Sequence, residues 1–131
     1  MTQVCVCGLI NHPNNPDLYL AVSRKNNPND FGLPGGKFEK EDIRYDWGLE
    51  REIIEETGLK TILNTNELFV NIENNNIVLT YKGIIHYKQH PDEIKTEETG
   101  EVKWLLASQL ITGSFTDYNK KMFDFFGIKY D

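Results

Sequence analysis

The sequence has few of the residues that would place it among secreted or membrane proteins. Its two cysteines, Cys5 and Cys7, are separated by one residue, too close for a comfortable structural disulfide. We interpret them as reduced core residues. No apolar run approaches the ~18 residues of a membrane span, and the amino terminus lacks a basic stretch followed by an apolar one. We therefore expect a soluble, cytoplasmic protein without a membrane partner.

The sequence also lacks an excess of basic residues. Its 14 Lys and Arg residues against 20 Asp and Glu residues give a net charge of −6, which argues against non-specific nucleic-acid binding. The same charge disfavours an anionic substrate unless divalent cations reverse the local field. A chain of 131 residues fits a single domain over 1–131, which would bury roughly two-thirds of its surface. We expect a monomer or a homodimer.

Acidic residues are what the sequence has in excess, and they are dense at residues 51–59, Arg-Glu-Ile-Ile-Glu-Glu-Thr-Gly-Leu. Glu52, Glu55 and Glu56 are spaced so that an α-helix places their carboxylates on one face. Hard cations such as Mg²⁺ or Mn²⁺ would relieve the repulsion between them, because these ions prefer oxygen ligands. Gly58 is suited to end such a helix in the left-handed conformation.

Two neighbouring features favour a metal site over the alternative, a solvated acidic helix face. Arg51 stands beside the glutamates, where it can orient a carboxylate. Pro34, Gly35 and Gly36 precede the helix and would allow the backbone to approach a ligand closely. Gly48 inside the helix costs about 1 kcal/mol relative to Ala, which predicts that the helix packs closely on a sheet at this point.

This motif resembles the box of the Nudix hydrolases, which ends in Arg-Glu-apolar-any-Glu-Glu-any-Gly-apolar. Residues 51–59 match that pattern at every position, and residues 33–39, Leu-Pro-Gly-Gly-Lys-Phe-Glu, resemble the segment leading into the box. The resemblance implies an α/β fold of the Nudix type, an α/β/α sandwich with a central mixed sheet. It also implies hydrolysis of a pyrophosphate bond in a nucleoside diphosphate linked to a further group X, a small-molecule nucleotide substrate.

The first half of the box departs from the family pattern. Asp42 stands where the family has a Glu, and eight residues instead of seven separate it from Arg51. We predict that the extra residue lies in the loop before the helix, with Asp42 as the helix N-cap. An insertion inside the helix would instead rotate the acidic face by roughly 100°. Asp42, Glu41 and Glu39 all remain candidates for the family's first acidic residue.

By resemblance, Glu52, Glu55 and Glu56 are assigned as metal ligands together with the Gly35 carbonyl. One of the three glutamates can instead serve as the general base, and the sequence does not say which. Arg51 is assigned an orienting salt bridge; the alternative is a surface ion pair worth less than about 1 kcal/mol. The implied cofactor is Mg²⁺ or Mn²⁺, which would offset charge on phosphoryl oxygens and generate hydroxide near neutral pH.

Glu98 is a further candidate for the metal site. It lies six residues before Trp104, a spacing similar to that of a glutamate in the bacterial mutator-type triphosphatase. This resemblance implies a metal ligand or base at Glu98, in preference to Glu97 and Glu101. The alternative is that this loop is acidic for solubility alone.

Residues 115–119 resemble the Phe-x-x-x-Asn segment of mutator-type enzymes, in which the Asn hydrogen-bonds a purine edge. An amide that both donates and accepts suits this role for Asn119. The alternative is that Asn119 or Asp117 is simply the N-cap of the last helix. Phe31, Leu33 and Tyr118 could form apolar or stacking walls of the same base pocket, or belong to the core. Neither the proline common after the box in ADP-ribose hydrolases nor the Ser-Gln-Pro-Trp-like string of NADH hydrolases is present.

The hydrophobic pattern predicts strands in hairpins, then the box helix, then further strands and a last helix. This order is typical of a mixed sheet with helices on both faces. Besides the box helix, expected strands cover residues 4–10, 18–22, 68–72, 77–87 and 101–105, loops cover 11–17 and 24–32, and helical segments cover 107–111 and 119–126.

Three functions remain open from the sequence. The first is a Mg²⁺-dependent nucleoside triphosphate pyrophosphatase that releases a nucleoside monophosphate and pyrophosphate. The second acts on another nucleotide-linked substrate, such as a nucleotide sugar, a dinucleoside polyphosphate or a capped RNA end. The third is a nucleotide-sensing module with an impaired site, which the intact Arg-Glu and Glu-Glu pairs at 51–52 and 55–56 disfavour.

Overall fold

The computed structural model describes residues 2–95 and 100–131. Its centre is a mixed sheet in which β3, β2, β1, β6 and β5 follow one another, while β4 pairs with β1 and β7 pairs with β2. The strands are β1 (Gln3–His12), β2 (Asn15–Arg24), β3 (Asn27–Gly32), β4 (Gly35–Lys37), β5 (Thr61–Glu73), β6 (Asn76–Ile85) and β7 (Val102–Leu106). The helices are α1 (Tyr45–Thr57) and α2 (Thr116–Phe126), with 3-10 turns η1 (Lys40–Asp42) and η2 (Ala107–Ile111).

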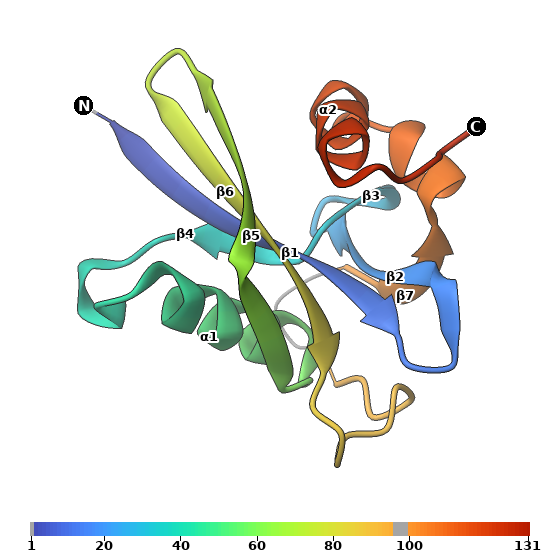
Figure 1. The fold of residues 1–131 in the computed structure, drawn as a ribbon. Coiled ribbons are helices and arrows are strands. Elements are labelled where there is room, and N and C mark those ends of the chain that lie inside the picture. The colour runs from blue at the N-terminus through green and yellow to red at the C-terminus, as the bar shows by residue number, and fades with distance from the viewer. Residues whose placement is uncertain (1, 96–99) are drawn as a thin grey trace.

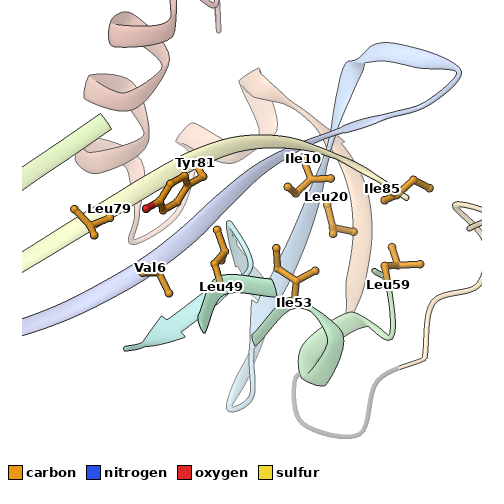
Figure 2. Packing of buried hydrophobic residues seen from close by; sticks show 9 residues of the cluster. All are labelled: Val6, Ile10, Leu20, Leu49, Ile53, Leu59, Leu79, Tyr81 and Ile85. Atoms are coloured by element: carbon orange, nitrogen blue, oxygen red, sulfur yellow. The ribbon is translucent and has the colours of Figure 1, made fainter. Parts of the chain in front are cut away.

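The helices α1 and α2 cover opposite faces of this sheet, which confirms the α/β/α sandwich expected from the sequence (Figure 1). On β1, Val6 and Ile10 belong to the buried cluster that includes α1. Figure 2 shows Leu49 and Ile53 of that helix in the same cluster. The intervening Leu9 belongs instead to the cluster that includes α2. Since side chains alternate along a strand, each face of the sheet has its own hydrophobic layer.

The C-terminal end of α1 follows from its local sequence. The helix ends at Gly58, whose φ is 77° and whose N–H donates to the Ile54 carbonyl at 2.8 Å. This confirms the prediction that Gly58 terminates the helix in the left-handed conformation. Leu49 and Ile53 are fully buried, which contributes about 1.5–3 kcal/mol each and sets the rotation of the helix about its axis. Within the described residues, no helix is long and apolar enough to cross a membrane.

The loops are shorter than the sequence predicts. The expected loop at 24–32 contains β3, which pairs with β2 through Ser23 and Phe31. β3 has the sequence Asn-Pro-Asn-Asp-Phe-Gly, which carries little intrinsic preference for a strand, so its conformation depends on tertiary pairing. The expected loop at 11–17 is also replaced in large part by strand. Two elements begin earlier than predicted, since β5 begins well before residue 68 and α2 begins before residue 119.

β1 determines how the site is assembled, because it joins strands from distant parts of the chain. It pairs in parallel with β6 and antiparallel with β4. The register places Gly35, Cys7, Thr80 and Phe69 in one row across β4, β1, β6 and β5. Cys7 lies two residues before Leu9 on the strand, so its side chain points to the α2 face.

Candidate active site

Arg51 on α1 holds together the carboxylates of the acidic motif. Its Nε and Nη2 donate to Asp42 Oδ1 and Oδ2 at 2.7 and 3.0 Å. Nη1 donates to the two carboxylate oxygens of Glu55 at 3.1 and 3.0 Å, and Nη2 also reaches Glu52 Oε1 at 3.2 Å. Arg51 therefore contacts two of the three motif glutamates, in the orienting position expected from the sequence.

The ionisable groups of this network differ in how their pKa values are shifted. Hydrogen bonds from Arg51 hold the pKa of Asp42 below its ordinary value, and the same contact raises the pKa of Arg51. Burial raises the pKa of Glu52, although Arg51 acts in the opposite direction. The Asp42–Arg51 pair is therefore the firmly ionised part of the network.

Asp42 is the acidic residue that contacts Arg51, among the three candidates for the first acidic position of the motif. The prediction that Asp42 caps α1 is wrong, because Asp42 ends η1 and Arg44 occupies the N-cap position. Between them lies Ile43, which is 78% exposed with φ of 67°. α1 itself is uninterrupted, so the irregular backbone of the longer spacing is confined to this loop.

Gly48 allows the segment before the helix to reach Arg51. A Cβ at Gly48 would lie 3.0 Å from Asp42 Oδ2 and 3.1 Å from Phe38 Cδ1. The prediction that this glycine lets the helix pack on the sheet is therefore wrong. The close contact is with the segment that precedes α1, because that segment folds back across the helix to place Asp42 beside Arg51.

Two glycines of β4 lie against the carboxylates of Glu56 and Glu52. The Gly35 N–H donates to Glu56 Oε1 at 2.7 Å. A Cβ at Gly36 would lie 2.6 Å from the carboxyl carbon of Glu52, and one at Gly35 would lie 2.0 Å from the Val6 carbonyl oxygen. Both positions therefore require glycine, which the sequence predicted for a close backbone approach.

The donor chemistry of this region fits a hard divalent cation. The carboxylates of Glu52, Glu55 and Glu56 offer only oxygen, which Mg²⁺ and Mn²⁺ prefer, and the space a Cβ would fill at Gly36 is occupied by a carboxylate. Within residues 2–95 and 100–131, however, no group of three or more His, Cys, Asp or Glu side chains is already gathered as a metal site. Arg51 and the Gly35 N–H hold these side chains instead.

A cleft of about 790 Å³ opens beside this carboxylate region. Gly35, Gly36 and Glu56 form part of its wall, and α2 contributes Tyr118 and Asn119. The structure therefore brings two distant sequence signals, the acidic motif and the segment before the last helix, to one cavity. Glu52, Glu55 and Arg51 lie outside the lining of this cleft.

Asn119 is 1% exposed, and its Nδ2 donates to the Leu110 carbonyl of η2 at 2.7 Å. The alternative prediction that Asn119 is the N-cap of the last helix is wrong, because Phe115 occupies that position and Asn119 lies inside α2. The bond to Leu110 fixes the orientation of the amide at the cleft wall. Among the described residues, this is the one hydrogen bond of that side chain.

The three apolar candidates for a base pocket differ in position. Leu33 and Tyr118 line the cleft. Phe31 does not, and its ring lies under Lys103, whose Nζ is 5.5 Å from the ring centroid. Gly32 lets Phe115 approach, because a Cβ there would lie 2.8 Å from the Phe115 ring.

Cys7, Thr80 and Tyr118 form a polar group on the cleft floor. Cys7 Sγ lies 3.0 Å from Thr80 Oγ1 and 3.8 Å from the Tyr118 hydroxyl, and Thr80 Oγ1 also contacts that hydroxyl. Burial raises the pKa of Cys7 to about 11 and raises the pKa of Tyr118 as well. Both side chains therefore remain protonated near neutral pH.

Several cleft residues were absent from the sequence prediction. Cys5 and Cys7 are free, as expected, but they are partly exposed and line the cleft, so the core assignment is wrong. Tyr118 of α2 reaches Cys7, but the cleft beside them leaves both cysteines partly exposed. Arg24 and Lys25 also line the cleft; a basic pair after a strand in an acidic chain is the signal that could have identified them.

Asp30 connects two walls of the cleft. Its carboxylate accepts the N–H and the hydroxyl of Ser114 at 3.0 and 2.5 Å and lies 3.7 Å from Arg24 Nη1. Hydrogen bonds from Ser114 lower the pKa of Asp30. The segment leading into α2 is thereby joined to Arg24 at the end of β2.

Glu98 lies outside the described residues, as does Glu97. Of the three glutamates considered there, Glu101 is described: it is exposed, and its carboxylate lies 3.4 Å from Lys103 Nζ.

Comparison with known proteins adds to this geometry. A family model described as NUDIX domain matches residues 1–126. A NUDIX hydrolase from Nitrosomonas europaea is similar in structure with a TM-score of 0.70 and 17% identity, over 99% of this chain and 93% of that chain. A MutT protein from Methanosarcina mazei Go1 gives a TM-score of 0.67 and 22% identity, over 98% and 96%. No match was found among curated proteins.

Proposed function

The chain belongs to the NUDIX family of hydrolases, and from this premise we propose that it is a metal-dependent nucleoside triphosphate pyrophosphatase. NUDIX hydrolases cleave pyrophosphate bonds in small nucleotide substrates and generally use divalent metal ions. The finer proposal is that this chain converts a nucleoside triphosphate to a nucleoside monophosphate and pyrophosphate with Mg²⁺ or Mn²⁺.

One observation carries the proposal: Glu56 and Asn119 line the same cleft. The first belongs to the acidic motif, and the second to the segment that resembles a purine-binding one. A nucleotide with its base near Asn119 could place its phosphates beside Gly35 and Glu56. Reaction and recognition would then occur in one cavity.

The residues of this chain have distinct proposed roles. Glu52, Glu55 and Glu56 would hold the cation together with the Gly35 carbonyl, and one of the glutamates could take a proton from water. When bound, the cation supplies charge neutralisation at phosphoryl oxygens and lowers the pKa of water. Arg51 would keep the carboxylates oriented.

Glu98 remains proposed as a further ligand or base. Leu33 and Tyr118 are proposed walls for the base, because both line the cleft with Asn119. Phe31 lies away from the lining, so any effect of Phe31 on the base would pass through its neighbours.

A second candidate function has a specific observation in its favour. Asn26, Asn71, Asn74 and Asn76 also line the cleft, and amides that both donate and accept suit hydroxyl groups. This lining would favour a nucleotide linked to a sugar. A nucleotide-sensing role without turnover is less favoured, because the Arg51 network is intact.

A substrate panel tests the proposal. Purified protein would be incubated with nucleoside triphosphates, nucleotide sugars, dinucleoside polyphosphates and capped RNA, in Mg²⁺, in Mn²⁺ or in excess chelator. We expect a nucleoside monophosphate and pyrophosphate by chromatography, only with the metal, and more turnover at mildly alkaline pH. Preferred cleavage of a nucleotide sugar would select the second candidate, and full turnover in chelator would remove the metal-dependent proposal.

A further inference from the structure

The hydroxyl and thiol groups on the cleft floor have no role in the hydrolysis proposed above. Cys7 and Tyr118 line the cleft, whereas Thr80 is fully buried beneath it. Thr80 Oγ1 is the shared partner of the other two groups. We refer to Cys7, Thr80 and Tyr118 as the floor trio.

We propose that the floor trio selects the base of the nucleotide, with the Tyr118 hydroxyl in contact with the base edge and Thr80 as the residue that positions this hydroxyl. The inference rests on the proposed function, because it takes the cleft as the nucleotide site. It adds a second polar determinant beside Asn119.

The chemistry of the trio fits a base and not a phosphate. Its members are two hydroxyls and a thiol, and burial raises the pKa of Tyr118 so that its hydroxyl stays protonated. Phosphates are recognised best by cations and by ionised donors. Uncharged hydroxyls instead suit the polar edge of a heterocycle, which presents neutral donors and acceptors.

The direction of the hydrogen bonds within the floor trio explains how Thr80 can orient the Tyr118 hydroxyl. If each group donates to the next around the triangle, the Tyr118 oxygen is left to accept a hydrogen bond from the ligand. If Cys7 donates to Thr80 and Thr80 to Tyr118, the Tyr118 O–H is left to donate. The hydroxyl at position 80 is common to both arrangements, so it orients the group that the ligand meets.

A structural role alone does not require this hydroxyl. Thr80 is 0% exposed, and its hydroxyl is hydrogen-bonded to Cys7 and Tyr118. A valine of the same shape would fill the position by packing alone. The Tyr118 ring is already held by Phe69, with ring centroids 5.7 Å apart, so packing fixes the ring while Thr80 fixes its hydroxyl.

The test compares base preference in Thr80→Val, Tyr118→Phe and the double variant. Thr80→Ser restores the hydroxyl. Thr61→Val is the matched control, because it removes a buried threonine hydroxyl from another part of the sheet. Values of kcat and KM for GTP, ATP, CTP and UTP would be measured, together with the thermal midpoint. In parallel, binding of GMP, AMP, CMP and UMP would be measured in excess chelator.

We expect Thr80→Val and Tyr118→Phe to reduce the preference among bases by about tenfold, mainly through KM. The double variant should be no worse than Tyr118→Phe alone, because Thr80 acts through that hydroxyl. Thr80→Ser and Thr61→Val should keep the wild-type preference.

Unchanged preference in both single variants would overturn the inference, and so would additive losses in the double variant. If the wild type hydrolyses no triphosphate, the proposed function fails by itself, and the monophosphate affinities still decide the role of the trio. If Thr80→Val does not fold, Cys7→Ala replaces it with the same expectation, because Cys7 is a hydrogen-bond partner of both Thr80 and the Tyr118 hydroxyl.

Discussion

On the α1 side of the sheet, the Arg51 network is made from one helix and the segment just before it, within residues 42–55. On the α2 side, the cleft draws on all of β1 to β6 and on α2, and Glu56 is the residue that α1 contributes to its lining. The first arrangement depends on spacing along one helix, and the second on strand register and packing. Substitutions on the α1 side should therefore change turnover, whereas those on the α2 side should change substrate preference.

The largest effect is expected for Glu56→Gln on the α1 side. The amide oxygen can still accept the Gly35 N–H, so the fold should be retained while the charge is lost. We expect turnover to fall by about 100-fold or more. Glu50→Gln on the same helix is the control, because Glu50 lies outside the motif contacts. Similar turnover in both variants would contradict the assignment of Glu56.

The next largest effect should come from Asn119→Ala on the α2 side. Loss of the amide should shift the preference among bases by about 1–3 kcal/mol while turnover of the best substrate survives. The buried Leu110 carbonyl would also lose its donor, which costs about 1–3 kcal/mol of stability. Catalytic efficiencies for four triphosphates and the thermal midpoint measure both effects. A lowered midpoint with unchanged preference would leave Asn119 a structural role only.

Asp42→Asn should have an intermediate effect, about tenfold on kcat/KM, because Arg51 loses its ionised partner. The folded pKa of Asp42 is lowered, so its stabilisation is present above its unfolded pKa of about 4. That stabilisation is lost as the pH falls through the folded pKa. The thermal midpoints of wild type and Asp42→Asn should therefore differ at neutral pH and converge in acid.

Glu41→Gln is the matched control for Asp42→Asn, because Glu41 is an exposed neighbour in η1. It should behave like the wild type. If Glu41→Gln reduced kcat/KM more than Asp42→Asn, Asp42 would no longer be favoured as the first acidic residue of the motif. Glu41 and Glu39 would then again be candidates.

The smallest effect is expected for Thr61→Val, at the start of β5. Thr61 Oγ1 is buried and has no hydrogen-bond partner among the described residues. Removing it should increase the free energy of unfolding by about 1 kcal/mol and leave turnover and preference unchanged. Chemical denaturation measures the first effect. A loss of stability would mean that the hydroxyl has a partner, such as water.

The sequence predicts the α1 side of the molecule better than the α2 side. The end of α1 at Gly58 and the close approach at Gly35 and Gly36 follow from local conformational rules, which act within a few residues. Asp42 could not be chosen from its neighbours by spacing, because its contact with Arg51 depends on the turn at Ile43 and on the space beside Gly48.

The α2 side depends on contacts between distant residues. The floor position of Cys7 follows from the parallel pairing of β1 with β6, which the hydrophobic pattern does not specify. The composition of β3 predicts a loop, and the sequence predicts a later start of the last helix, which makes Asn119 a candidate cap although α2 begins at Thr116. In each case, long-range packing overrides local preference.

The pairing of β1 with β6 also bears on the order in which the chain folds. β1 is synthesised before β6, so the edge of β1 at Gln3 is not covered until Asn76 has been made and pairs with it. Residues 4–10 contain no charged side chain, so the uncovered edge resembles a segment that associates with other chains. Distant pairing also slows folding. The yield of native protein should therefore fall as chain concentration and temperature rise during synthesis, because chains associate before they fold. The stability of the folded protein alone would not predict this loss.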